Sequence, residues 1–509
     1  MTQPDTVRAL IAHAAAANRS HVALAMPQTT PIAYGALGEL VEETGSALRR
    51  AGYGAETRLA VVMANGAPLA ATVFALAANA AVAPLNPGYR AEELEFYLSD
   101  LGADALILAE GDSGPAGPVA AALDIPIATL KTEPSRPGGL ALEMPTIGPP
   151  APDGAPSADD TALLLHTSGT TSRPKLVPLS GANLCASAHN IATTLKLVPE
   201  DRCLSIMPLF HIHGLIAAVL ASFAAASTVI CSPGFNALKL FGWMAEAEPS
   251  WITAVPTMHQ AMLARAARNR ETIAATKLRF LRSSSAALPA PVMAELETVF
   301  DAPVVEAYGM TEAAHQMACN PLPPGARKPG SVGPAAGPEI AILGENGNPL
   351  TAGEVGEVAI RGANVTRGYE HNEEANKAAF TGRWFRTGDL GRLDAEGYLM
   401  LTGRLKEIIN RGGEKISPRE VDEALAQHPA VGQAVTFALA HKALGQDVAA
   451  AVVLREGAEA EPAELRSFLA ERLADFKVPR RILILDSIPT GPTGKFQRIG
   501  LAEQLGLEP

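Results

Sequence analysis

Short, continuous runs of apolar residues mark the first two thirds of the chain. One run covers residues 59–63, and it is followed by an Asn-Gly turn, a helix-length stretch to about Asn79 and a second run at 80–84. Apolar runs of strand length that alternate with turns and helices are typical of buried parallel strands. Similar runs occur at 105–108, 229–231, 251–253 and 280–281. The pattern predicts an α/β fold with a large N-terminal domain of helix-covered, mainly parallel sheets.

Two long uncharged stretches, residues 59–89 and 204–238, resemble membrane spans in length. The first contains the Asn65-Gly66 turn, and the second contains Pro208 and two histidines. A transmembrane helix needs about 20 predominantly apolar residues without such interruptions. We therefore expect buried strand–turn–helix–strand segments and no membrane span.

The pattern changes towards the C-terminus. After Gly330, short strands separated by turns predict a small antiparallel β region. After about Gly403, a hairpin-like basic stretch (404–415) leads into a smaller α+β domain with helices at 418–427 and 462–473 and strands at 448–454 and 481–485. We expect domains 1–402 and 403–509, the first divided into subdomains of about 1–158 and 159–330 and the β region 331–402. The Pro- and Gly-rich segment 132–159 predicts a surface linker.

Composition narrows the function classes. The 509 residues carry a formal net charge of −12, which is the wrong sign for a protein that binds nucleic acid or anionic lipid through a broad basic surface. The four cysteines form no C-x-x-C pair, and the N-terminus has no basic region followed by an apolar core. We expect a cytoplasmic protein that binds small molecules, as a monomer or a dimer.

A hydroxyl-rich loop follows the apolar run that ends near His166. Its backbone N–H groups and hydroxyls suit phosphate oxygens, and Lys175 adds positive charge. It lacks the second glycine and the Lys-Ser/Thr ending of a Walker A motif. Taken alone, such a stretch is more often an ordinary loop than a phosphate site.

Five motifs in order give this loop its meaning: Thr-Ser-Gly-Thr-Thr-Ser-Arg-Pro-Lys (167–175), Tyr-Gly-Met-Thr-Glu (308–312), Trp-Phe-Arg-Thr-Gly-Asp (384–389), Gly-Arg-Leu-Lys-Glu (403–407) and Pro-Thr-Gly-Lys (492–495). This order resembles the adenylate-forming superfamily of acyl-CoA synthetases, luciferases and peptide-synthetase adenylation domains. Two positions depart from the usual pattern, because Ser172 and Leu176 stand where glycine is common. Neither departure removes a charge.

The resemblance implies an ATP-dependent acid–CoA ligase that uses Mg²⁺. Glu312 would hold the metal, Thr311 the α-phosphate, and Asp389 the ribose with Arg404 beside it. Lys495 would be the mobile lysine that reaches both the carboxylate and the α-phosphate during adenylation. The remaining nucleotide residues implied are Thr167, Ser168, Gly169, Thr170, Thr171, Lys175, Ser285, Ala286, Ala287, Glu306, Ala307 and Tyr308.

The same resemblance implies a mobile C-terminal domain that turns between two half-reactions. Lys406 matches the hinge, where residues absorb backbone change rather than perform chemistry. The residues implied for CoA are Gly412, Gly413, Glu414, Lys415 and, more weakly, Arg419. A tight turn around glycine is the simpler interpretation of this stretch, and it predicts no dependence on CoA.

The expected acyl pocket is polar. Hydroxyls at 283–285 and the histidines His211, His213 and His315 suit a small, doubly charged acid, since a buried second carboxylate without partners is costly. Residues 306–315, 320–323 and 327–333 resemble the oxalate–CoA ligases. Carried over by position, Ser285 and His315 would bind the distal carboxylate, helped by either His211 or His213.

Three alternatives stay open at this point. Another acyl-CoA synthetase, for malonate, a medium-chain acid or an aryl acid such as 4-coumarate, would share the nucleotide residues. A domain that loads a carrier protein is disfavoured because no carrier segment follows Lys495. A catalytically idle nucleotide-binding protein is disfavoured because Lys175, Glu312, Asp389, Arg404 and Lys495 are all retained.

Overall fold

Two large sheets form the bulk of the structure, a computed structural model that describes residues 3–167, 174–491 and 493–507. The first sheet runs, strand by strand, β7 (Leu140–Glu143), β6 (Ile127–Thr132), β5 (Ala105–Ala109), β3 (Arg58–Val62), β4 (Ala81–Leu85), β8 (Thr161–Thr167) and β9 (Lys175–Ser180). The second runs β15 (His315–Cys319), β14 (Val304–Met310), β13 (Phe280–Ser284), β12 (Trp251–Ala254), β10 (Arg202–Ser205), β11 (Thr228–Cys231), β1 (Val22–Ala25) and β2 (Ile32–Ala33).

Pairing in both sheets is parallel at the centre and antiparallel at the edges. In the first sheet, β7 and β9 pair antiparallel with their neighbours; in the second, β2 and β15 do so. The unit β3–helix–β4 has the expected parallel pairing, with Leu59 beside Val82. The expected α/β class with mainly parallel sheets is therefore confirmed.

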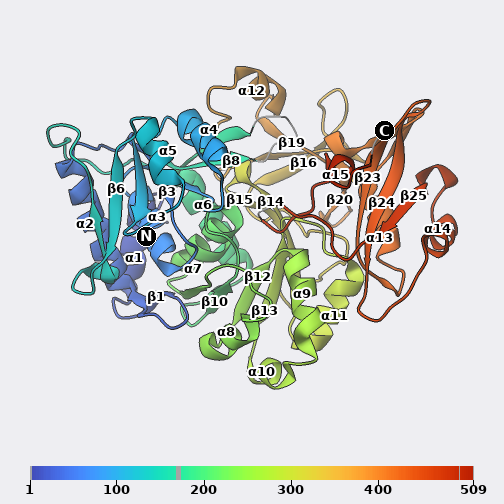
Figure 1. Cartoon of the computed structure of the whole chain (residues 1–509), viewed down its shortest axis with the longest axis horizontal. Helices are drawn as coiled ribbons and strands as arrows, with labels where there is room; N and C mark the ends of the chain where they lie inside the picture. The colour runs from blue at the N-terminus through green and yellow to red at the C-terminus, as the bar shows by residue number, and fades with distance from the viewer. Residues whose placement is uncertain (1–2, 168–173, 492, 508–509) are drawn as a thin grey trace.

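Helices form layers between and outside the sheets (Figure 1). The central layer packs one apolar cluster against both sheets and contains α1 (Val7–Ala17), α2 (Tyr34–Arg50), α3 (Ala67–Ala77), α6 (Gly181–Thr194), the π-helix η2 (His213–Leu220) and α7 (Ala221–Ala224). The outer layer on the first sheet contains α4 (Ala91–Leu101) and α5 (Ala116–Ala122). The outer layer on the second contains α8 (Leu240–Ala247), α9 (Pro256–Ala266), α10 (Arg270–Ala275) and α11 (Ala290–Phe300).

A smaller antiparallel sheet packs on the end of β14 and β15. It contains β16 (Glu339–Leu343), β17 (Gly356–Arg361), β18 (Phe380–Thr381), β19 (Trp384–Leu393) and β20 (Leu399–Arg404), with α12 (Glu373–Ala379) beside it. Its core includes Tyr308 and Met317 from the second large sheet. The predicted β region is thus anchored directly on β14, which runs into the Tyr-Gly-Met-Thr-Glu motif, and on β15, which follows it.

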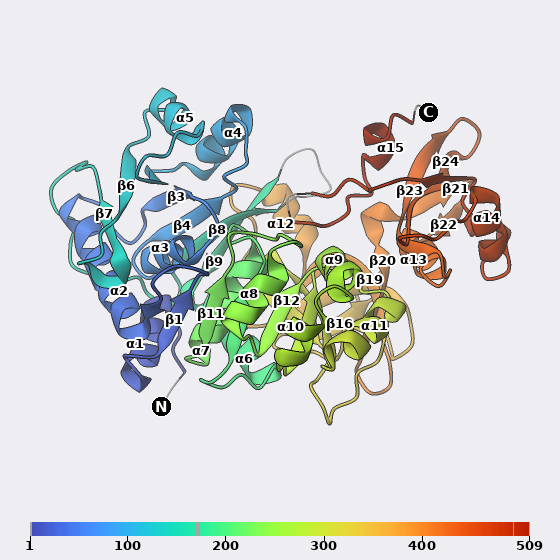
Figure 2. The same ribbon diagram turned by 60° about the horizontal axis from the view of Figure 1, so that its bottom comes forward.

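The C-terminal sheet has cores of its own on both faces. Its strands are β21 (Ile409–Arg411), β22 (Glu414–Ile416), β23 (Val431–His441), β24 (Gly445–Leu454) and β25 (Arg481–Ile484), with α13 (Pro418–Leu425), α14 (Pro462–Ala470) and α15 (Leu501–Gln504). A segment after β25 reaches back from this sheet towards the middle of the molecule (Figure 2).

Three details differ from the sequence-based expectation. The segment 132–159 is not linker throughout, because β7 pairs with β6 inside it. The long strand β23 was missed, because alanine, glycine and glutamine weaken its apolar pattern. The large sheets also take strands from both sides of residue 158, since β8 and β9 join the first sheet and β1 and β2 join the second. The division into domains stays a prediction.

The two long uncharged stretches fold as strands and buried helices. Residues 204–238 contain the end of β10, the π-helix η2, α7 and β11. Within the described part of the chain, none of the helices combines the length and the apolar character that crossing a bilayer would need.

Candidate active site

The candidate residues gather where the parallel strands of the second large sheet end. Open α/β sheets bind ligands at this edge because loops from several strands meet there. Strand β13 leads into Ser285, and β14 leads into the short helix η3 (Thr311–Ala313). The hairpin of β19 and β20 contributes Asp389 and Arg404, which are register partners.

Glu312 is buried on η3 and is held by Tyr369. The Tyr369 hydroxyl donates to Glu312 Oε1 at 2.8 Å. Burial raises the pKa of Glu312, whereas the tyrosine hydrogen bond and the charges of Arg404 and Lys175 lower it. The carboxylate is fixed in position with cations around it, and Thr311 is partly exposed next to it.

Asp389 is held between an arginine and a tyrosine. Arg404 Nε lies 3.2 Å from Asp389 Oδ1, and the Tyr308 hydroxyl donates to Asp389 Oδ2. Burial raises the pKa of Asp389, and the charge of Arg404 opposes that shift. This is a preorganised acceptor of the kind that suits a pair of sugar hydroxyls.

Lys495 lies at the same site although it belongs to the C-terminal segment. The Thr257 hydroxyl donates to the carbonyl oxygen of Gly494 at 2.8 Å, which fixes this segment on α9. Burial and the charge of Arg404 lower the pKa of Lys495 to about 8, against the opposing effect of Asp389 and Glu312. The structure therefore places the ammonium within reach of the charges on the other candidates.

Of the phosphate-loop candidates, Thr167 and Lys175 are described. They are register partners at the ends of β8 and β9, and Lys175 Nζ lies 4.3 Å from the centroid of the Tyr369 ring. Burial and the charge of Lys406 lower the pKa of Lys175, while Glu312 raises it. The other candidates of this loop, Ser168, Gly169, Thr170 and Thr171, lie outside the described residues.

A buried polar cluster surrounds Ser285. His213 Nδ1 lies 3.0 Å from Ser285 Oγ, and the rings of His213 and His315 are 4.9 Å apart. Neither ring nitrogen of His315 has a hydrogen-bond partner among the described residues. The backbone is strained, with positive φ at Ser285 (76°) and His315 (98°), as is common where a site is preorganised. Gly309 permits this packing, because a Cβ there would lie 1.8 Å from the His315 carbonyl oxygen.

Both members of the His211/His213 pair lie near this cluster, in different ways. His213 is fully buried inside it, whereas His211 is partly exposed and accepts the His213 backbone N–H at Nδ1, 3.3 Å away. Burial lowers the pKa of His211 well below its usual value, and the charge of Lys495 lowers it further. His211 thus lies close enough to Lys495 for the charge of the lysine to act on it.

Only one of the three consecutive serines joins the cluster. Ser284 donates to the Ala307 carbonyl oxygen at 2.9 Å, and the Ser283 hydroxyl is buried without a partner among the described residues. Ser283 is next to Arg282 in a strand, so it points to the opposite face of the sheet. The expectation of three hydroxyls in the pocket is wrong, because strand alternation turns Ser283 to the opposite face and the Ala307 carbonyl already accepts the Ser284 hydroxyl.

The CoA candidates lie on the C-terminal sheet. Gly412, Gly413, Glu414 and Lys415 are exposed at the β21–β22 hairpin, where both glycines have positive φ (62° and 103°). Arg419 Nε is paired with Glu423 at 2.6 Å. Lys406 is exposed on the turn η4 (Leu405–Glu407), which connects β20 to the C-terminal sheet. The charge of Lys406 acts on Lys175 and that of Arg419 acts on Asp389, so these two residues lie near the nucleotide candidates.

Family models match the chain in two blocks. The AMP-binding enzyme model matches residues 11–370, and the AMP-binding enzyme C-terminal domain model matches residues 420–495. The chain belongs to the AMP-binding enzymes. This confirms the resemblance that the five motifs suggested.

Similar proteins cover nearly the whole of this AMP-binding enzyme. A probable CoA ligase of Humulus lupulus is 44% identical, with 99% of this chain and 97% of that protein aligned. The oxalate–CoA ligase of Arabidopsis thaliana is 43% identical, with 97% of each chain aligned. Among solved structures, ATP-bound MatB from Rhodopseudomonas palustris is 28% identical with a TM-score of 0.86, covering 98% of this chain and 99% of that one.

In this AMP-binding enzyme, Glu306 supports the loop that carries Ser285, Ala286 and Ala287. Its Oε1 accepts the Leu288 backbone N–H at 3.0 Å, and its Oε2 has no partner among the described residues. Ala286 and Ala287 are exposed on that loop, and Ala307 is buried beside Tyr308. Burial raises the pKa of Glu306 to about 7.

This raised pKa predicts that Glu306→Gln stabilises the protein at alkaline pH. The folded state holds the proton more tightly than the unfolded state, so the wild type loses stability as the pH rises from about 4.5 to about 7. The loss is at most about 3 kcal/mol, and a neutral amide avoids it. We expect the melting temperature of Glu306→Gln to exceed that of the wild type at pH 8 and to match it at pH 4, below both pKa values. Exposed Glu459 provides the matched Glu→Gln control, and an equal gain at both pH values would contradict the prediction.

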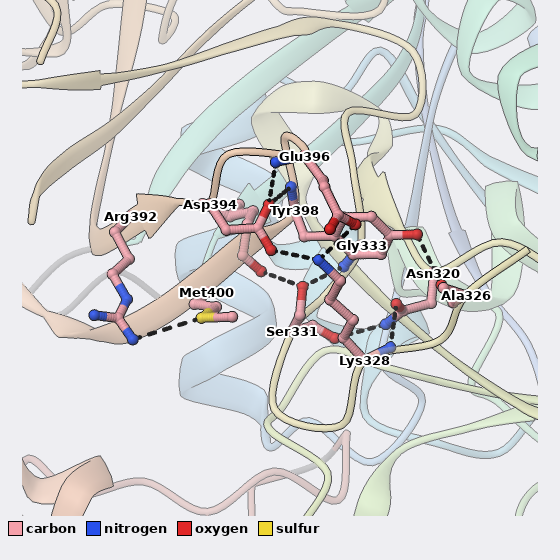
Figure 3. A network of polar contacts seen from close by, with 11 residues as sticks. Asn320, Ala326, Lys328, Ser331, Gly333, Arg392, Asp394, Glu396, Tyr398 and Met400 are labelled. Carbon is pink, nitrogen blue, oxygen red and sulfur yellow. Dashed lines mark hydrogen bonds and ion pairs between the residues drawn. The ribbon is translucent and has the colours of Figure 1, made fainter. Parts of the chain in front are cut away.

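The loop after β15 braces the small β sheet (Figure 3). Lys328 Nζ lies 2.6 Å from Asp394 Oδ2, and the Asn320 side chain donates to the Ser331 carbonyl oxygen at 2.6 Å. Ser331 Oγ donates to the Leu399 carbonyl oxygen at 2.8 Å. These contacts fix the β19–β20 hairpin, and with it Asp389 and Arg404, against β14 and β15.

Two neighbours of the candidate residues were missed from sequence. Tyr369 contacts both Glu312 and Lys175, but 57 residues separate it from Glu312, and Gly-Tyr on its own gives no signal. Arg282 is fully buried beneath Ser285. An arginine directly after the apolar pair Phe280-Leu281 was a signal that could have been found, because charged residues are rarely buried without a reason.

Proposed function

We propose that this AMP-binding enzyme is an oxalate–CoA ligase. It would convert oxalate, ATP and CoA to oxalyl-CoA, AMP and pyrophosphate through an oxalyl-adenylate. The observation that carries the proposal is the buried cluster of Ser285, His213 and His315 beside Glu312, Asp389 and Lys495. The full-length similarity to an oxalate–CoA ligase supports it.

In the first half-reaction, one oxalate carboxylate would attack the α-phosphorus of ATP while pyrophosphate leaves. ATP and CoA are the substrates that fit the family. Lys495 would neutralise charge on the carboxylate and the α-phosphate, and Thr311 would donate to the α-phosphate.

Other residues would hold the nucleotide. Asp389 would accept from the ribose hydroxyls while Arg404 keeps it charged. Lys175 would stabilise the leaving phosphates, together with Thr167 and the loop that follows it. Such fixed groups stabilise the transition state without reorganising.

The residues also fit Mg²⁺. Within the described part of the chain, the His, Cys, Asp and Glu side chains form no group of three or more that would hold a metal unaided. Mg²⁺ commonly takes one or two carboxylates and completes its shell with substrate phosphates and water. Glu312 is a buried carboxylate of that kind, and the ion would neutralise phosphate charge.

The second carboxylate explains the polar pocket. A fatty acid would need an apolar cavity. Here the Ser285 hydroxyl and the two ring nitrogens of His315, which have no hydrogen-bond partner among the described residues, leave hydrogen-bonding capacity unused. Buried polar atoms without partners are costly. A small dianion would use that capacity, with Ser285 and His315 binding the distal carboxylate and His211 close to the reacting one.

In the second half-reaction, the CoA thiol would attack the adenylate and release AMP. Lys406 lies on the connection between the small β sheet and the C-terminal sheet, so rotation there would replace Lys495 with another face of the C-terminal domain. Gly412, Gly413, Glu414 and Lys415 would then line the route of the pantetheine, with Arg419 near a CoA phosphate.

A panel of acids tests the proposal. Pyrophosphate release is measured with purified protein, ATP, Mg²⁺ and CoA for oxalate, malonate, acetate, octanoate and a cinnamate. We expect oxalate to give the highest kcat/KM by at least about tenfold, since a matched polar site rejects acids that leave it unpaired. Preference for octanoate or a cinnamate would overturn the substrate while keeping the ligase. No release with any acid would support an idle nucleotide-binding protein.

A further inference from the structure

Arg282 is a fully buried cation that has no acidic partner among the described residues. Its side chain is 0% exposed, on the sheet face that carries Trp251, Phe280 and Val305. Its contacts among the described residues are neutral, and none of them is a carboxylate. An unpaired buried charge costs several kcal/mol, so a role at the adjoining pocket is expected.

The contacts of Arg282 lead directly to the acyl cluster. Its NH1 lies 3.4 Å from Thr253 Oγ1 and 3.5 Å from His213 Nε2, and Thr253 Oγ1 lies 2.7 Å from His213 Nε2. Thr253 and Arg282 are register partners on β12 and β13, so their side chains share a face. Gln316 Oε1 accepts from NH2 at 3.2 Å and steadies the guanidinium from the other side.

The chemistry of these groups determines where the His213 hydrogen lies. A guanidinium can only donate, and Arg282 NH1 lies near both Thr253 Oγ1 and His213 Nε2, so both atoms are placed as acceptors towards it. An unprotonated Nε2 also accepts the Thr253 hydroxyl hydrogen. Burial and neighbouring positive charge favour neutral His213, which carries one ring hydrogen. That hydrogen must then lie on Nδ1, where it is donated to Ser285 Oγ. The Ser285 hydroxyl hydrogen is left to point at an incoming acceptor.

We propose that Arg282 is a positioning residue for the second carboxylate of the substrate: acting through Thr253 and His213, it turns Ser285 into a hydrogen-bond donor, and its charge compensates that of the dianion. The inference rests on the proposed use of oxalate. It assigns a role to three residues, Arg282, Thr253 and His213, that form one relay.

Thr253→Val tests the relay with little change of shape. We expect the KM for oxalate to rise about tenfold or more, because losing a hydrogen bond that orients a charged contact costs about 1.4 kcal/mol or more. The KM for ATP and kcat should change less than about threefold, since the nucleotide residues are untouched. Thr228→Val is the matched control: Thr228 is a buried threonine of the same sheet whose hydroxyl lies 3.3 Å from His21 Nε2, at the opposite ends of the strands.

Arg282→Met and Arg282→Lys add a test of charge. His213 faces His315, Arg282, His211 and Lys495, all of which oppose its protonation. Arg282→Met removes both the charge and the hydrogen bonds to Thr253 and Gln316, so its oxalate KM should rise at least as much as that of Thr253→Val, whereas its ATP KM should change less than about threefold. Arg282→Lys keeps the charge and should recover part of the loss in oxalate KM.

The outcomes separate the two proposals. A wild-type enzyme that does not use oxalate overturns the proposed function and the inference with it. A wild-type enzyme that uses oxalate, with a Thr253→Val oxalate KM within about twofold of the wild type, overturns the relay alone. Equal weakening of oxalate and ATP in Thr253→Val means a structural role only. If Arg282→Met does not fold, Thr253→Val decides.

Discussion

Lys495→Ala is expected to abolish oxalyl-adenylate formation while leaving thioester formation from supplied oxalyl-AMP largely intact. The structure places this lysine within reach of the charges of Arg404, Asp389 and Glu312. Removing one preorganised electrostatic group costs about 10²- to 10³-fold in rate, and a loss of at least that size should appear in ATP-dependent pyrophosphate release. The CoA thioester assay starts after this step and does not need the lysine.

The matched control is Lys239→Ala, which replaces an exposed lysine just before α8 and should leave both half-reactions unchanged. Equal loss of both half-reactions in Lys495→Ala would refute the assignment to adenylation alone.

The pKa of Lys495, lowered to about 8, also predicts the direction in which the rate of adenylation changes with pH. Because the charged form is needed, kcat/KM for ATP in adenylation should fall as the pH rises above about 8, and Lys495→Arg should show no such fall.

Glu312→Gln is expected to cause the second large loss of adenylation activity. The substitution keeps the size and the Tyr369 hydrogen bond but removes the charge that would hold Mg²⁺, so we expect pyrophosphate release to fall about 10²- to 10³-fold. The Mg²⁺ concentration for half-maximal rate should rise in parallel. The measurement is a Mg²⁺ titration at saturating ATP and oxalate.

Tyr369→Phe is the control for this result. It removes only the hydrogen bond of 2.8 Å to Glu312 and leaves the carboxylate in place. A hydrogen bond to a charged group contributes about 1.5–3 kcal/mol, so a loss of about ten- to a hundredfold is expected. A larger loss in Tyr369→Phe than in Glu312→Gln would contradict the role given to the carboxylate.

The parts of the fold that could be predicted are those that short patterns of apolar and turn residues encode. The run at 59–63, the Asn-Gly turn and the next run at 80–84 fold as β3, α3 and β4 with parallel pairing. The strand β23 was missed because most of its residues are small or polar, and the edge strand β7 was missed because prolines and glycines surround it. Edge and two-sided strands carry weaker periodicity than buried parallel strands.

The candidate site was predictable where motifs are contiguous, as with Glu312 and Asp389. It was not predictable where contacts depend on the path of distant segments. Tyr369 reaches Glu312 across 57 residues, and Thr253 meets Arg282 only because β12 and β13 are neighbours in the sheet. The three serines show a further limit: their order in sequence looks like one surface, but the pleat divides them between two faces.

The separate cores of the C-terminal sheet have a kinetic consequence. Lys495 is tethered to the site through the turn at Leu405–Glu407 and is docked by contacts such as that between Thr257 and Gly494. Its effective concentration at the nucleotide is therefore set by the length and stiffness of that tether. Inserting residues into this turn would lower the effective concentration of Lys495 at the nucleotide site without altering any side chain of the pocket.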